Sequence, residues 1–211
     1  MSERVVAGAR EFGLDLSPAQ TELLDRFVAE VYGWRGGHGL TAIRRQDADR
    51  LHIVDSLSAA PFFSGVSHIA DLGSGAGFPG IPLAIALGPT RLTLVDSNRK
   101  RANFLRHVRR SLELDNVEIV ESDVRALEPA GARFDGVVAR AFRGPAEFLR
   151  LAAAISTQRA AIVLMAGPIG DDELGNAQTE AGDLTTLREV RRFQLPAGSE
   201  ARVVARFERL P

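Results

Sequence analysis

Residues 71–78 read DLGSGAGF. Asp71 and Leu72 end an apolar, strand-like run that begins at residue 68, and the glycine-rich stretch follows directly. Glycine adopts positive φ angles easily and lets the main chain approach a ligand, because no Cβ stands in the way. Pro79 follows, and it suits the first turn of a helix, where its missing N–H costs nothing. A strand, a glycine loop and a helix in this order predict a ligand-binding loop in an α/β sheet.

The chain downstream of this loop alternates between strand-like and helical segments. This alternation predicts a mostly parallel sheet with right-handed crossovers and helices on both faces. Two later runs, 184–195 and 200–208, leave no room for a helix between them, so we expect an antiparallel hairpin. The expected strands are 68–72, 91–96, 117–121, 134–140 and 160–165, and the expected helices are 79–88, 98–114 and 145–156.

The segment before the loop is expected to be helical. Ser17 and Pro18 form a helix start, and apolar residues then recur at helical spacing as far as Trp34. Four glycines between residues 33 and 39 predict a loop, and a second amphipathic helix is expected over 46–62. We therefore predict an N-terminal helical extension, 1–58, followed by one α/β domain, 59–211.

The composition is that of an ordinary globular protein of 211 residues, with 45% apolar and 25% charged residues. The absence of cysteine excludes disulfides, thiolate nucleophiles and cysteine-based zinc sites, and it is compatible with the cytoplasmic location that we expect. No apolar run is long enough for a membrane span, and the charged first 25 residues do not read as a secretory signal. Lys100 is the single lysine, and the abundant arginine suits phosphate contacts, although a GC-rich genome would give the same bias.

Two ligands compete for the glycine loop. Residues 75–80 match the G-x-G-x-x-G pattern of dinucleotide-binding loops, but Pro79 removes an N–H that a pyrophosphate would use. Asp71 at the strand end instead suits the amino and carboxyl ends of a methionine moiety. This favours S-adenosylmethionine over NAD, and a plain glycine turn is the remaining alternative.

Acidic residues after the next two strands support the same cofactor. Asp96 follows Gly77 by 19 positions and can accept both ribose hydroxyls of an adenosine. Ser97 or Asn98 can cap the next helix, which would leave Asp96 free. Asp123, after the third strand, is placed for a polar contact with adenine. Together with the glycine loop, these acids predict an S-adenosylmethionine site.

Longer motifs resemble one family. They are DLGSGAGFPGIPLAI (71–85), LVDSNRKRANFL (94–105), FDGVVARAF (134–142) and HIVDSL (52–57). These stretches, between Trp34 and Ala141, resemble the RsmG (GidB) family of 16S ribosomal RNA methyltransferases. The resemblance implies a Rossmann-like class I methyltransferase fold, methylation of N7 of the guanine at position 527, and 16S ribosomal RNA or the small ribosomal subunit as partner. No protein partner is inferred.

The family's cofactor contacts fall on Gly73, Phe78, Val124, Arg125 and Arg140 of this chain. With the residues derived above, the predicted cofactor set is Asp71, Gly73, Ser74, Gly75, Gly77, Phe78, Asp96, Ser97, Asp123, Val124, Arg125 and Arg140.

Two positions depart from the family pattern: Gly39 stands where asparagine is usual, and Ala166 where lysine is usual. A diverged small-molecule methyltransferase on the same fold, or a cofactor-binding regulator without turnover, is therefore the alternative.

Methylation of guanine N7 needs no general base, because the ring nitrogen carries an in-plane lone pair and no proton. Position and orientation then supply most of the acceleration, so no residue is assigned a catalytic role. The candidates for orienting the substrate are Arg140, Arg143 and His52, and Asp55 lies one helical turn from His52. The other histidines lack metal-ligand spacing, and we expect no metal.

Charge is distributed unevenly along the chain. The stretch 91–110 carries a local balance of +6, and positions 99, 106 and 110 share one helix face. Such a face is suited to RNA, although a solvated helix surface is equally consistent. Residues 171–183 are acidic, so phosphate should avoid them. Tyr32 and Trp34 read as core residues more readily than as stacking partners for a base.

Overall fold

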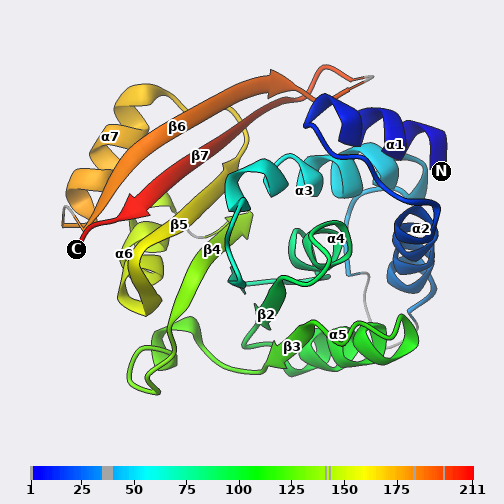
Figure 1. The fold of residues 1–211 in the computed structure, drawn as a ribbon, viewed down its shortest axis with the longest axis horizontal. Helices are drawn as coiled ribbons and strands as arrows, with labels where there is room; N and C mark the ends of the chain where they lie inside the picture. The colour runs from blue at the N-terminus through cyan, green and yellow to red at the C-terminus, as the bar shows by residue number, and fades with distance from the viewer. Residues whose placement is uncertain (1, 35–39, 141, 143, 183, 197) are drawn as a thin grey trace.

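The structure is a computed structural model that describes residues 2–34, 40–140, 142, 144–182, 184–196 and 198–211. Its centre is one seven-stranded sheet with the order β3-β2-β1-β4-β5-β7-β6 (Figure 1). Strands β1 to β5 are parallel, and β7 runs antiparallel to both β5 and β6. The strands are β1 His68–Leu72, β2 Arg91–Val95, β3 Val117–Val120, β4 Phe134–Arg140, β5 Ser156–Ala166, β6 Thr185–Gln194 and β7 Ala201–Arg209. The predicted parallel sheet and C-terminal hairpin are confirmed.

Helices cover both faces of the sheet, as predicted. Helices α6 and α7 pack on one face, where Phe148 and Leu174 are fully buried in the same apolar cluster as Ile162 of β5. Helices α4 and α5 pack on the other, where Ile81 and Phe104 are fully buried. Figure 1 shows α6 and α7 on one side of the view and α1, α2 and α5 on the other. The longer helices are α1 Ser2–Glu11, α2 Pro18–Gly33, α4 Gly80–Ala86, α5 Arg99–Ser111, α6 Pro145–Ile155 and α7 Asp171–Glu180.

The N-terminal helices share the core of the sheet. Val5 of α1 and Phe27 of α2 are fully buried in the same cluster as Ile81 and Phe104. Helix α2 starts as the sequence predicts: the Ser17 hydroxyl accepts a hydrogen bond from the Gln20 N–H, and the Gln20 side chain accepts one from the Ser17 N–H. The N-terminal extension is therefore packed on the α/β unit through a continuous apolar core, and its boundary at residue 58 stays a prediction.

The single helix predicted over 46–62 is wrong. The chain instead forms four short helical segments: η1 Arg45–Asp47, η2 Asp49–Val54, α3 Asp55–Leu57 and η3 Ala60–Phe63. Segment η2 is a π-helix, and Pro61 at the start of η3 has no N–H to continue the preceding helix. Most of the predicted glycine loop, 35–39, lies outside the described residues.

Strand β5 begins four residues earlier than the prediction of 160–165. Ser156 pairs with Phe134, whereas Ala161 pairs with Gly136. Residues 157–160 of β5 therefore lie opposite the single residue Asp135 of β4, which makes the register irregular. Arg159 in this interval has a positive φ of 61°. An irregularity of this kind breaks the period-2 pattern, which hides the start of the strand in the sequence. None of the described helices is long and apolar enough to cross a membrane.

Candidate active site

The glycine loop follows β1 at the carboxyl edge of the sheet. Gly73, Gly75 and Gly77 have φ angles of 73°, 59° and 91°, which only glycine adopts without strain. Gly80 is required for a second reason: a Cβ there would lie 2.6 Å from Asp71 Oδ2. That oxygen accepts a hydrogen bond from the Gly80 N–H at 3.0 Å. Asp71 thus fixes the loop to the first turn of α4.

Asp96 connects the loop to the end of β2. Its Oδ2 accepts from the Gly75 N–H at 2.9 Å, and its Oδ1 accepts from the Asn98 N–H at 2.8 Å. The helix cap is Asn98, whose side chain accepts from the N–H groups of residues 100 and 101. The expectation that Asp96 stays free is therefore corrected: it holds two main-chain groups. Each carboxylate oxygen still has acceptor capacity for a hydroxyl.

A cavity, called the cofactor-side cavity below, opens beside Asp96 at the ends of β1, β2 and β4. Seven residues of the predicted cofactor set line it: Gly73, Asp96, Ser97, Asp123, Val124, Arg125 and Arg140. Five others do not: Asp71, Ser74, Gly75, Gly77 and Phe78. The rest of the wall is formed by six residues outside the predicted set: Val95, Arg101, Ser122, Phe142, Glu147 and Leu151. Val95, Arg101 and Phe142 lie within the quoted motifs and Ser122 directly precedes Asp123, whereas nothing in the sequence distinguishes Glu147 or Leu151.

The cavity offers the contacts that an adenosine needs. Asp96 is 5% exposed and can accept ribose hydroxyls, while Val95 and Val124 supply apolar surface. Asp123 is exposed, and its carboxylate accepts from the Arg125 N–H, which orders the short turn η4, Val124–Ala126. The Asp96 carboxylate, which can accept from ribose hydroxyls, lies beside a glycine loop whose main chain a ligand can approach closely. This combination fits S-adenosylmethionine.

Arg140 separates this cavity from a second one. Its guanidinium donates to Asp55 Oδ2 at 3.2 Å, to the Leu51 carbonyl at 3.2 Å and to His52 Nδ1 at 3.3 Å. The other oxygen of Asp55 accepts from Arg202 at 3.0 Å. The second cavity, about 450 Å³, is called the acceptor cavity below and is lined by Thr41, Ile43, Leu51, His52, Asp55, Arg140, Met165, Ala166, Gly167 and Arg202.

The remaining candidates lie as follows. The Phe78 ring is buried and stacks on the His52 ring, with centroids 4.0 Å apart. His52 and Asp55 are both buried, and both contact Arg140. Trp34 packs edge-on against Phe104, so the core interpretation holds for it. Arg143 lies outside the described residues.

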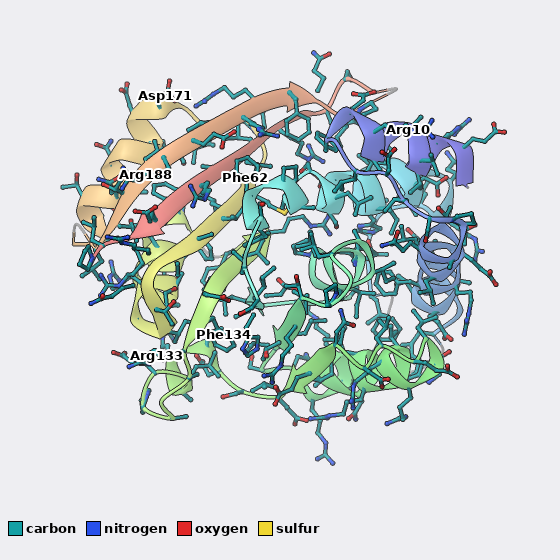
Figure 2. All side chains as sticks on the ribbon, in the orientation of Figure 1. Arg10, Phe62, Arg133, Phe134, Asp171 and Arg188 are labelled. Atoms are coloured by element: carbon teal, nitrogen blue, oxygen red, sulfur yellow. The ribbon has the colours of Figure 1, made fainter. Side chains whose placement is uncertain are left out.

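Some of the basic residues in the stretch 91–110 pair with carboxylates, and others do not. Arg101 lies 3.6 Å from Asp96, and Arg106 pairs with Glu121 at 2.8 Å. Among the residues that the structure describes, no carboxylate pairs with Arg99, Lys100, Arg109 or Arg110, all of which are exposed. On the acidic segment, Asp171 at the start of α7 lies at the molecular surface (Figure 2) and pairs with Arg192 at 2.7 Å.

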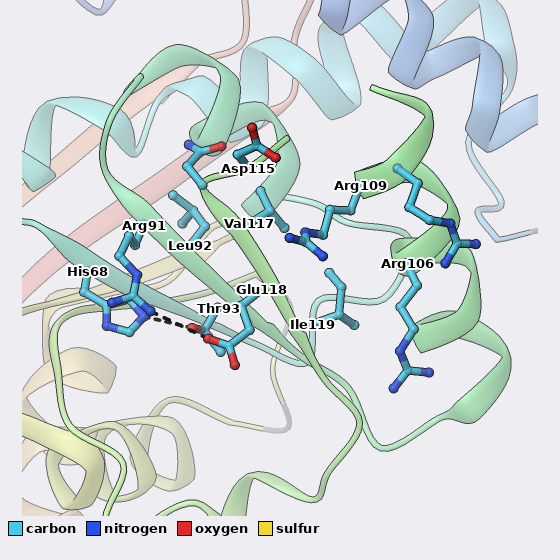
Figure 3. Close-up of a pocket in the computed structure, with 12 residues that line it drawn as sticks. His68, Arg91, Leu92, Thr93, Arg106, Arg109, Asp115, Val117, Glu118 and Ile119 are labelled. Atoms are coloured by element: carbon cyan, nitrogen blue, oxygen red, sulfur yellow. Dashed lines mark hydrogen bonds and ion pairs between the residues drawn. The ribbon is translucent and has the colours of Figure 1, made fainter. Parts of the chain in front are cut away.

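A further cavity, about 500 Å³, lies around β2, β3 and α5 (Figure 3). Arg91, Arg106 and Arg109 line it, and Arg91 faces Glu118 at 3.9 Å. Arg91 opens β2, so this cavity reaches the amino end of the strands, whereas open α/β sheets bind ligands at the carboxyl ends. We do not assign it to the cofactor. No cluster of three or more His, Asp or Glu side chains in the described ranges is arranged to hold a metal.

Asp71 gives the site a pH signature. Burial raises the pKa of Asp71 from 3.8 to about 7, because the charged carboxylate is cut off from water. Between these values the folded protein holds a proton that the unfolded chain has lost. The free energy of unfolding is therefore expected to fall as the pH rises from about 4 to about 7.

Replacing Asp71 with asparagine should remove this part of the pH dependence, because the amide is neutral throughout. Urea unfolding of the cofactor-free protein at several pH values measures this pH dependence. Asp115→Asn, which removes an exposed carboxyl group, is the control. An unchanged pH slope in Asp71→Asn would contradict the assignment.

The fold and the cofactor-side cavity define a Rossmann-like S-adenosylmethionine-dependent methyltransferase. Among solved structures, TrmN from Thermus thermophilus aligns with a TM-score of 0.57 over 74% of this chain at 20% identity. The chain spans about half of that structure, 49%, so this likeness concerns the fold alone.

The family is settled by sequence. The family model GidB, rRNA small subunit methyltransferase G, matches residues 20–197, and the chain belongs to this family. Ribosomal RNA small subunit methyltransferase G from Pseudomonas syringae pv. syringae is 38% identical over 82% of this chain and 80% of its own length. The protein of the same name from Polynucleobacter asymbioticus is 38% identical over 85% of each chain. The predicted family and cofactor are confirmed.

Proposed function

We propose that this enzyme transfers the methyl group of S-adenosylmethionine to N7 of the guanine at position 527 of 16S ribosomal RNA. The observation that carries the proposal is the position of Arg140, which lines both the cofactor-side cavity and the acceptor cavity. Two cavities that share one side chain adjoin each other, which supports direct transfer from a donor in one to an acceptor in the other.

The residues present suit a reaction without proton abstraction. S-adenosylmethionine supplies a methyl group on a positively charged sulfur, which keeps the electron pair of the broken bond. Asp96 and Gly73 hold the adenosine end, and the acceptor cavity orients the base so that the N7 lone pair faces the methyl group. His52 cannot act as a base toward a proton that N7 does not carry, and its role here is positioning.

The substrate proposed is the small ribosomal subunit or its RNA, which places the enzyme in the cytoplasm. The exposed cations of α5 support this, because Arg99 and Lys100 begin the helix next to Ser97 of the cofactor-side cavity. Phosphates neutralised by such residues release counterions, so binding should weaken with added salt.

A small-molecule acceptor is the second candidate, and one observation favours it. Ala166 lines the acceptor cavity at the position where the family usually has lysine. An enzyme that handles no phosphate there would not need the cation. A cofactor-binding regulator without turnover is the third candidate.

Transfer of tritium from labelled S-adenosylmethionine distinguishes these candidates. Small subunits from a strain that lacks the modification, and isolated 16S RNA, serve as acceptors. Incorporation that maps to guanine 527 is the expected result. Tight cofactor binding without incorporation into either acceptor would overturn the proposal.

A further inference from the structure

A chain of polar contacts leads from Arg140 to Thr41 at the rim of the acceptor cavity. Arg140 Nη2 lies 3.3 Å from His52 Nδ1, and His52 Nε2 lies 2.8 Å from the Thr41 hydroxyl oxygen. The stacked Phe78 ring holds the imidazole between these two partners. All three polar side chains line the acceptor cavity.

The direction of these hydrogen bonds follows from their chemistry. A guanidinium has donors only, so His52 Nδ1 must accept. Burial, and then the charge of Arg140, lower the pKa of His52 to about 3, so the imidazole is neutral and carries one proton. That proton is on Nε2, and it is therefore donated to Thr41.

Thr41 is left with one unused function. Its oxygen accepts from His52 Nε2 and also from the Ile43 N–H at 3.1 Å, which occupies both lone pairs. The hydroxyl proton remains, and no hydrogen bond from it to an acceptor is found within the described part of the chain. Arg140 and His52 thus fix Thr41 as a donor toward whatever occupies the acceptor cavity.

We propose that Thr41 is a specificity-determining residue whose hydroxyl donates a hydrogen bond to O6 of the substrate guanine. The inference rests on the proposed function. Guanine presents N7 and O6 side by side on one edge, whereas adenine has an amino donor in place of O6. The usual reader of this edge, an arginine bound to both atoms, is excluded here, because N7 must stay open to the methyl group.

The test pairs two variants with two bases. Thr41→Val removes the hydroxyl at nearly constant volume, and Thr41→Ser keeps it. Small subunits are reconstituted with 16S RNA that carries guanine or 2-aminopurine at the acceptor position; 2-aminopurine keeps N7 but lacks O6. Methyl transfer is measured as kcat/KM. Binding of the subunits to the enzyme is measured in parallel, as a second readout for 2-aminopurine, on which transfer is expected to be slower.

On guanine, Thr41→Val is expected to lower kcat/KM by about tenfold to a hundredfold, since a site built for a hydrogen bond penalises its loss. Thr41→Ser should stay near the wild-type value. On 2-aminopurine, Thr41→Val and wild type should be equal in transfer, or in binding if transfer is too slow. Cofactor affinity should be unchanged in both variants, which shows that they fold.

An equal loss on both bases, or an equal loss in Thr41→Val and Thr41→Ser, would overturn the inference and indicate a structural role. Failure of the proposed function looks different. In that case the wild-type enzyme transfers no methyl group to the guanine subunits at all.

Discussion

Replacing Asp96 with alanine is expected to weaken S-adenosylmethionine binding by about a hundredfold or more, because we propose that its carboxylate accepts two charge-assisted hydrogen bonds from the ribose. The variant also releases the N–H groups of Gly75 and Asn98, which the carboxylate holds at 2.9 and 2.8 Å. Isothermal titration calorimetry of wild type and variant measures the loss.

Asp115→Ala is the matched control, because it removes an exposed carboxylate beyond the C-terminal end of α5, outside the cofactor-side cavity, and should bind the cofactor normally. Thermal unfolding separates a lost contact from a lost fold. An affinity equal to wild type in a folded Asp96→Ala protein would show that the cofactor-side cavity has been misassigned.

Replacing Arg140 with methionine is expected to lower the free energy of unfolding by about 1.5–3 kcal/mol, because the buried Asp55 carboxylate loses a charge-assisted hydrogen bond while it keeps its second partner, Arg202. The Arg140 side chain is 19% exposed and that of Asp55 is 6% exposed, so the contact is largely screened from bulk water. Methyl transfer should be lost as well, because Arg140 lines both cavities. Urea unfolding and a transfer assay measure the two effects.

Arg188→Met is the control for this prediction. Arg188 pairs with Glu208 at 2.8 Å, but its side chain is 47% exposed. Ion pairs at the surface contribute roughly 0–1 kcal/mol, so the control should be only slightly destabilised. Equal losses in the two variants would mean that Asp55 keeps its solvation or its second partner, Arg202, compensates fully.

The sheet was predictable because its strands are apolar runs separated by helices with their own periodicity. Strand β4 was expected over 134–140 and is observed there. Prediction failed where the backbone leaves the regular period. Over the few residues of η2, apolar spacing cannot distinguish a π-helix from an α-helix. The irregular start of β5 lacks the alternation of apolar and polar residues that marks a strand.

The cofactor-side cavity and the acceptor cavity likewise differ in how far the sequence predicts them. Residues of the cofactor-side cavity follow the ends of consecutive strands, so Asp96 and Asp123 could be placed together from their positions in the alternation. The acceptor cavity joins residues that no local pattern connects: Arg140 pairs with Asp55 across 85 positions, and Arg202 reaches it across 147. Only the folded chain brings Thr41 and Arg202 to one cavity.

That long-range closure sets an order of events during synthesis. Residues 71–125, which contain most of the cofactor side, leave the ribosome well before Arg202 on β7 is made. Asp55 must wait for nearly 150 further residues before both of its oxygens are paired. All residues that line the cofactor-side cavity are therefore made before β7, whereas the acceptor cavity stays incomplete until β7 has been added to the sheet. Premature termination within β6 would remove Arg202 from the acceptor cavity, together with the strand that pairs with both β5 and β6.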